Sequence, residues 1–204
     1  MQISLHHTGK RFNREWIFRN LSYVFEPGKP YAITGPNGSG KSTLLQVIAG
    51  ATLHNSGSIE YTDLRIPEKR IESPYKNIAF AAPYLDLIEE MTGAEFLSFH
   101  NAFKPLSRSI PELLNSVGLR NAADKQIRYY SSGMKQRLKL GQAFFSDTPV
   151  LLLDEPTGNL DAEGIALYQS LIAEQLSKKL IIVSSNDPME YAYCDFVLNI
   201  NDYK

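Results

Sequence analysis

The chain has 204 residues, which is enough for one α/β domain with a substantial core but too few for two independent enzymes. Its formal net charge of −1 supplies no large basic field, so we expect no nucleic-acid partner. A single cysteine, Cys194, excludes a disulfide within the chain, and no apolar run approaches the ~20 residues that span a bilayer. We therefore expect a soluble protein that reaches a membrane only through a partner.

The first part of the chain alternates apolar and polar residues in the manner of β-strands. Short strands are predicted at residues 2–5, 21–25, 31–34, 59–61 and 76–82. Residues 9–16 are expected to form a polar loop between the first two strands, and residues 55–58 a turn. A helix is predicted at residues 43–49 and is closed by Gly50.

The second part alternates longer helices with strands. Helices are predicted at residues 95–103, 110–117, 131–146 and 162–176. Buried strands are predicted at residues 150–153 and 180–183, with a last helix and strand near the C-terminus. Because strands that alternate with helices pair in parallel, we predict a mostly parallel sheet with helices on both faces.

Between strand 31–34 and helix 43–49 the sequence reads GPNGSGKST, which satisfies the pattern G-x-x-x-x-G-K-[ST] in full. The glycines let successive backbone N–H groups point into one concavity, and the helix N-terminus adds positive potential there. Lys41 supplies a cation for the β- and γ-phosphates, and the Ser42 hydroxyl is a ligand for Mg²⁺. We therefore predict a phosphate-binding loop of Gly35, Pro36, Asn37, Gly38, Ser39, Gly40, Lys41, Ser42 and Thr43.

The strand at 150–153 delivers two adjacent carboxylates to the end of the sequence VLLLDE. Alone this pattern is an ordinary strand with a charged end, but a phosphate loop earlier in the chain favours a nucleotide site. We predict that Asp154 holds Mg²⁺ directly or through water and that Glu155 polarises the attacking water.

Ser131 in the sequence YSSGMKQR is a good helix N-cap. The backbone N–H groups that follow it, including that of Gly133, emerge free at a helix N-terminus. This arrangement indicates either a second anion site or a simple helix cap.

The sequences GPNGSGKST, YSSGMKQR and VLLLDEPTGNLD, in this order, resemble the ATP-binding cassette (ABC) ATPases over essentially the whole chain. The resemblance implies a phosphate-loop NTPase core with an N-terminal antiparallel β-subdomain and an inserted helical lobe. On this basis residues 1–204 are one ABC ATPase domain, with the core at 1–83 and 131–204 and the lobe at 84–130. Details of the sequence look more like bacterial export-type cassettes than sugar importers.

The family implies a head-to-tail dimer of two copies with two molecules of ATP, and Mg²⁺, sandwiched between them. On that basis Ser131 and Gly133 contact the γ-phosphate held by the partner chain, and Asp161 lies in the acidic loop that crosses the interface. Phe12 matches the position that stacks on adenine, with Trp16 as the local competitor. A flat π face is all that stacking needs, at roughly 1–3 kcal/mol by analogy with nucleic-acid bases.

Two positions depart from the family pattern. Pro83 stands where the switch glutamine is expected, unless a shift offers Tyr84 or Asp86 instead, and proline has no side-chain acceptor. Asn186 stands where the switch histidine is expected; its amide still donates a hydrogen bond to a phosphate oxygen but carries no proton charge. We therefore expect either hydrolysis through Glu155 that is slow and weakly coupled, or compensation by neighbouring residues.

The lobe of this family docks on cytoplasmic helices of a membrane partner. Phe96, Phe99 and Phe103 share one helix face, and we expect them to form the lobe's own core, with a place in the docking groove as the alternative.

These features predict the ATP-hydrolysing subunit of an ABC transporter, which powers separately encoded integral membrane subunits from a cytoplasmic position at the inner face of the membrane. The alternative is a nucleotide-dependent switch or scaffold with little turnover. A role on DNA or ribosomes is disfavoured, because the chain has one cassette and no basic tail.

Overall fold

The computed structural model describes residues 1–64 and 71–204. The chain forms two compact units. The first unit comprises Met1–Ile78, Pro149–Asp154 and Leu176–Lys204, and the second comprises Ala79–Thr148 and Glu155–Gln175. The division into a core and a lobe that begins at residue 84 stays a prediction.

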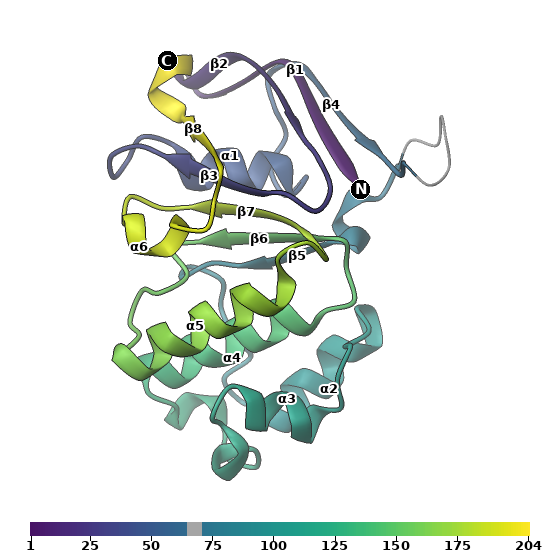
Figure 1. Cartoon of the computed structure of the whole chain (residues 1–204), viewed down its shortest axis with the longest axis vertical. Coiled ribbons are helices and arrows are strands. Elements are labelled where there is room, and N and C mark those ends of the chain that lie inside the picture. Colours follow the sequence, from purple (N-terminus) through teal and green to yellow (C-terminus); the bar gives the residue numbers. More distant parts are fainter. Residues whose placement is uncertain (65–70) are drawn as a thin grey trace. The chain divides into compact units, whose positions relative to one another are not determined.

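The first unit contains an antiparallel sheet with the strand order β2-β1-β4, which confirms the predicted N-terminal β-subdomain (Figure 1). Its strands are β1 (Gln2–Phe12), β2 (Glu15–Phe25) and β4 (Ser56–Thr62). They bury Ile3, Leu5, Phe18, Leu21 and Phe25 almost completely. These residues form the subdomain's apolar core.

The predicted polar loop at 9–16 is wrong, because β1 and β2 continue into it as a hairpin in which Phe12 faces Glu15. Asn13 makes the turn with a left-handed φ of 53°, a conformation that asparagine tolerates better than most residues. A cation–π contact stabilises a polar side chain in this hairpin, because Lys10 Nζ lies 4.8 Å from the centroid of the Phe12 ring.

Two boundaries also differ from the prediction. The turn expected at 55–58 lies largely inside β4, where Gly57 has a φ of 73° opposite an irregularity in β1 between His6 and Gly9. A Cβ at Gly57 would lie 2.2 Å from the His6 carbonyl oxygen, so only glycine fits this bulge. Lys76 and Asn77 belong to a short 3-10 helix, η1 (Pro74–Asn77), whose proline removes a strand donor.

The first unit also contains strands in the order β6-β7-β3-β8, and their parallel pairing confirms the predicted parallel sheet. They are β3 (Pro30–Thr34), β6 (Val150–Asp154), β7 (Leu180–Ser184) and β8 (Phe196–Asn199). Every residue of β6 and β7 is buried, which explains their continuous apolar sequences. Helices α1 (Lys41–Ile48) and α6 (Pro188–Tyr191) and the 3-10 helix η4 (Ile200–Tyr203) belong to the same unit.

The second unit holds the remainder of β5 (Ile78–Ala81) and most of the helices. These are α2 (Gly93–Phe103), α3 (Ile110–Ser116), α4 (Ser132–Phe145) and α5 (Ala162–Gln175), with short 3-10 helices η2 (Arg120–Ala122) and η3 (Ile127–Tyr129). Capping boxes start α2 at Thr92 and α3 at Ser109. Gly141 lets α4 approach α3 closely, because a Cβ there would lie 2.9 Å from Leu113 and Val117.

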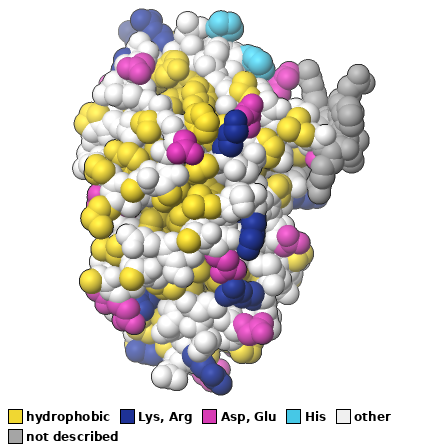
Figure 2. All heavy atoms as spheres, viewed as in Figure 1, with side chains coloured by type: hydrophobic (Ala, Val, Ile, Leu, Met, Phe, Trp, Pro, Cys, Tyr) yellow, Lys and Arg dark blue, Asp and Glu magenta, His cyan; other side chains and the backbone are white. Residues whose placement is uncertain are grey.

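No helix within residues 1–64 and 71–204 combines the length and apolar character that a membrane crossing requires. Figure 2 shows acidic and basic side chains interspersed with hydrophobic ones on the face in view, which agrees with the small net charge.

Candidate functional site

The predicted phosphate loop connects β3 to α1 in the first unit. Gly38 and Gly40 adopt left-handed φ values of 76° and 100°, and Gly40 is the N-cap of α1. A Cβ on Gly40 would lie 2.2 Å from Ile17 Cγ2, so the close approach of β2 requires glycine at this position. The backbone therefore has the turn that aims amide groups into one concavity.

Lys41 is buried and its ammonium lies over the loop. Nζ donates to the carbonyl oxygens of Gly35 at 2.9 Å and Pro36 at 3.2 Å. Carbonyl oxygens are weaker partners for an ammonium than phosphate oxygens, which carry full charge. A bound phosphate group would exchange these contacts for stronger ones.

Asp154 ends β6 with a carboxylate that is 1% exposed, and its Oδ1 has no hydrogen-bond partner among the described residues. Burial of such an oxygen is costly unless a cation pairs with it. Carboxylate and hydroxyl oxygens are the ligands that Mg²⁺ prefers, and Ser42 supplies a hydroxyl from the same unit. The residues present therefore fit a magnesium ion.

Ser184 is a candidate residue of the nucleotide site that the sequence analysis missed. Its Cα pairs with those of Asp154 and Ile33 on the neighbouring strands, and its buried Oγ has no partner among the described residues. The available signal was a polar residue that ends the apolar strand β7, because the carboxyl ends of parallel strands meet at one sheet edge.

Asn186 lies beside the phosphate loop, where its Nδ2 donates to Asn37 Oδ1 at 3.1 Å. This contact brings the predicted switch position and a loop residue together. The Asn186 amide therefore has the reach to contact a group bound on the loop.

The two candidate rings for adenine differ in exposure. The Phe12 side chain is 50% exposed at the tip of the β1–β2 hairpin. Trp16 packs over the backbone, where a Cβ on Gly9 would lie 2.9 Å from its ring, and Arg11 covers it at 5.6 Å from the centroid. Lys10 Nζ also lies over the Phe12 ring, but Phe12 is the more exposed of the two rings.

Glu155 follows Asp154 directly and opens the second unit's last segment. Its backbone has a φ of 42°, a left-handed conformation that costs a non-glycine residue of order 1–3 kcal/mol. Such strained residues persist only where the surrounding structure enforces them, and they cluster at functional sites.

Ser131, Gly133 and Asp161 line one hollow of about 290 Å³ in the second unit. Ser131 caps α4 as predicted, and its Oγ accepts from the Met134 N–H at 3.2 Å. Asp161 Oδ1 accepts from Arg137 Nη2 at 2.9 Å and from the Gly164 N–H at 2.8 Å. These contacts lower the pKa of Asp161, chiefly through the Gly164 amide and then through Arg137.

Gln136 and Arg137 of α4 were not among the predicted site residues. Gln136 is buried and its Nε2 donates to the Pro156 carbonyl at 2.8 Å, so it ties α4 to the residue after Glu155. The available signal was its spacing, because Gln136 stands at i with the apolar Leu140 and Ala143 at i+4 and i+7 on one helix face.

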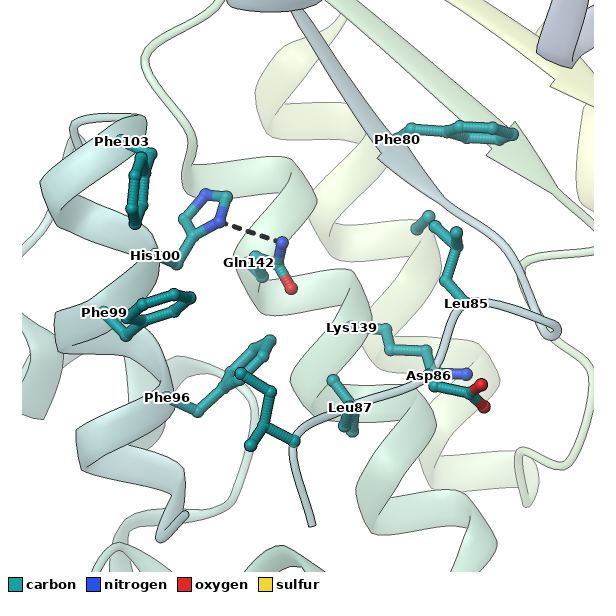
Figure 3. A pocket seen from close by; sticks show the side chains of 12 residues that line it. Phe80, Leu85, Asp86, Leu87, Phe96, Phe99, His100, Phe103, Lys139 and Gln142 are labelled. Carbon is teal, nitrogen blue, oxygen red and sulfur yellow. Dashed lines mark hydrogen bonds between the residues drawn. The ribbon is translucent and has the colours of Figure 1, made fainter. Parts of the chain in front are cut away.

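The expectation that all three phenylalanines of α2 form the lobe's core is wrong. Phe96 is 7% exposed, but Phe99 and Phe103 are 47% and 74% exposed. All three line a groove of about 320 Å³ in the second unit, into which their rings point (Figure 3). Helices α3 and α4 cover only part of the α2 face that carries these three rings. Phe99 and Phe103 therefore stay at the surface.

Two polar side chains form the floor of this groove. Gln142 Nε2 donates to His100 Nδ1 at 3.0 Å (Figure 3). His100 Nε2 lies 2.9 Å from Ser146 Oγ. Burial, and to a lesser extent Lys104, lowers the pKa of His100 to about 4, so the ring is neutral at pH 7. The groove therefore has a largely apolar lining with a neutral His100–Gln142 pair, and its charged lining residues are Asp86 and Lys139.

Pro83 has a partner that the sequence did not indicate. Lys139 of α4 lines the same groove, and its Nζ donates to the Pro83 carbonyl at 2.7 Å. The segment where the switch glutamine was expected is thus held through its backbone.

Comparisons with known proteins identify the family. The model of the ABC transporter family matches residues 18–158. The chain is similar to the uncharacterised ABC transporter ATP-binding protein YybJ of Bacillus subtilis, with 30% identity over 196 residues that cover 94% of this chain and 89% of the relative. It is similar to the lantibiotic transport ATP-binding protein SrtF of Streptococcus pyogenes, with 32% identity over 90% of this chain and 79% of the relative.

A solved dimeric ATP-binding cassette in a post-hydrolysis state, bound to ADP and Pi, has the same fold. It superposes with a TM-score of 0.81 and 21% identity over 97% of this chain and 94% of that chain. The family match and these relatives show that the chain belongs to the ABC transporter family, as an ATP-binding subunit.

Proposed function

We propose that this ABC subunit binds MgATP, closes head-to-tail on a second copy, and hydrolyses ATP through Glu155 to drive separately encoded membrane subunits. The observation that carries the proposal is the pairing of a phosphate loop with a buried, unpartnered carboxylate oxygen of Asp154 in one unit. This is the donor set that holds a nucleotide and its Mg²⁺.

On the phosphate-loop side, the amides of residues 35–43 cradle the phosphates and Lys41 neutralises their charge. Ser42 and Asp154 hold Mg²⁺, and Phe12 stacks on the adenine. Its exposed ring supports Phe12 over the covered Trp16.

On the signature side, Ser131 and Gly133 bind the γ-phosphate held by the second copy. The hollow that they share with Asp161 supports this role. Because the Asp161 carboxylate is occupied by Arg137 and Gly164 in its own chain, we propose that it fixes the shape of the loop that crosses the interface. The dimeric form of the solved cassette supports the assembly.

Phosphate release from MgATP over a series of protein concentrations tests this function. Turnover per chain should rise with concentration until the dimer saturates, since each site needs both copies. Turnover per chain that is constant over a hundredfold dilution would contradict the dimer requirement.

We infer that hydrolysis is slow because of Pro83 and Asn186. The Asn186 amide reaches the loop, but it cannot stabilise charge as a histidine does. An Asn186→His chain should therefore show a kcat several-fold higher, on the order of 1 kcal/mol in activation free energy. Pro83→Gln is the separate second variant; no increase from either would sink the idea that these positions limit the rate.

We propose that the groove under Phe99 and Phe103 takes an apolar helix of the membrane partner. Their exposure and the neutral floor at His100 support this use. The double change Phe99→Ala, Phe103→Ala should reduce the fraction of chain retained on membranes of the source cells about fivefold. Tyr129→Ala removes another exposed ring, of 63% exposure, outside the groove and should leave retention unchanged.

On this proposal the chain works at the cytoplasmic face of the membrane through its partner, with residues 84–130 proposed as the lobe and 1–83 and 131–204 as the core. No relative or contact reported above favours the switch or scaffold alternative over transport.

A further inference from the structure

The residue after η4, Lys204, reaches back to the phosphate loop within the first unit. Its Nζ donates to the Ser39 carbonyl at 2.6 Å and to the Ile17 carbonyl at 2.9 Å. Arg19 Nε in turn donates to the Lys204 carbonyl at 3.4 Å. One ammonium thus joins the loop, strand β2 and the segment that follows η4.

The first residue of η4, Ile200, packs against the glycines of the same phosphate loop. Ile200 is fully buried, and Cβ atoms added to Gly35 and Gly40 would lie 2.9 Å and 3.5 Å from its side chain. Ile200 therefore fills the space that these glycines leave free. The loop's conformation depends on a segment more than 150 residues away in the sequence, as the 165-residue separation of Ser39 and Lys204 shows.

The contact with Ser39 has a consequence for anion binding. The Ser39 carbonyl and the Gly40 N–H belong to one planar trans peptide, so they point in opposite directions. An ammonium that holds the carbonyl fixes the direction of the Gly40 N–H and polarises it as a donor. The Ser39 side chain does not perform this task, because its Oγ has no hydrogen-bond partner among the described residues.

We propose that Lys204 is a positioning residue for the phosphate loop, which orients the Gly40 N–H toward the phosphates of bound ATP. The proposal rests on the nucleotide site proposed above and adds a residue that lies outside the loop and outside residues 18–158, which the family model matches. Lys204 acts through the Ser39–Gly40 peptide and is not itself a phosphate ligand.

The test compares Lys204→Met, Lys204→Arg and the control Lys178→Met, which removes the same charge from an exposed position of the same unit. For each chain we would measure the Kd of magnesium pyrophosphate by competition with a fluorescent ATP analogue, and the nucleotide-free Tm. Because pyrophosphate carries phosphate groups but no adenine, its Kd reports only the contacts made to the phosphates.

Lys204→Met should weaken pyrophosphate binding about fivefold, the size of one net hydrogen bond, with little change in Tm. The Lys204→Arg chain should keep most of the wild-type affinity for pyrophosphate, and the Lys178→Met chain should bind pyrophosphate as tightly as the wild type. Equal affinity in Lys204→Met and wild type would overturn the inference, as would an equal loss in Lys178→Met. A loss that follows a fall in Tm and is not rescued by arginine would also overturn it, in favour of a structural role. A wild-type chain that binds neither probe would overturn the nucleotide site itself, and this inference with it.

Discussion

A Glu155→Gln chain is expected to release phosphate from MgATP at least about a hundredfold more slowly than the wild type, because an amide is too weak a base to polarise the attacking water. ATP binding should survive, since the phosphate loop and Asp154 are untouched. Closed dimers should therefore accumulate with MgATP and be visible by light scattering or sedimentation.

The left-handed backbone of Glu155 makes this substitution a clean probe, because glutamine has the same size and meets the same strain. Glu163→Gln is a suitable control, since that exposed carboxylate lies on α5 and forms its ion pair with Arg137, at 3.4 Å, in the second unit. Wild-type turnover in the Glu155→Gln chain would remove Glu155 from the mechanism.

An Asp154→Asn chain is expected to lose the dependence of ATP binding on Mg²⁺ and to lose hydrolysis, because an amide oxygen is a poor magnesium ligand. In buffer without Mg²⁺ its Tm should be equal to or higher than that of the wild type. The reason is that the buried, unpartnered Oδ1 carries a desolvation cost that a neutral amide reduces.

The ATP affinity measured over a series of Mg²⁺ concentrations checks the first effect. Thermal unfolding in EDTA measures the Tm without Mg²⁺. Asp195→Asn removes an exposed carboxylate from the same unit and should change neither. A clear fall in Tm without Mg²⁺ would show that Asp154 has a stabilising partner in the chain, and would count against the magnesium role.

The parts of the fold that the sequence predicts well are those with local causes. The phosphate loop is specified by its own glycines, and the strands β6 and β7 by unbroken apolar runs that only burial on both faces explains. Ser131 was predictable as an N-cap because capping depends on the residue and its next few neighbours.

The parts that the sequence did not predict depend on distant contacts. The hairpin at residues 9–16 reads as a loop, because the contact of Arg11 with the Trp16 ring forms only once β1 and β2 pair. The exposure of Phe99 and Phe103 depends on how much of α2 its neighbours cover, which periodicity does not report. The Asp161 contacts with Arg137 likewise span 24 residues.

The central claim, that each ATP site is shared between two copies, is tested most directly by mixing two defective chains. Lys41→Ala removes the cation of the phosphate loop, and Ser131→Arg fills the signature hollow, so each chain alone should be inactive. In an equal mixture, half of the dimers carry one intact site formed by the loop of one chain and the signature of the other. The account predicts that phosphate release recovers to about a quarter of the wild-type rate, as expected for random head-to-tail pairing. A mixture no more active than the sum of its two components would contradict it.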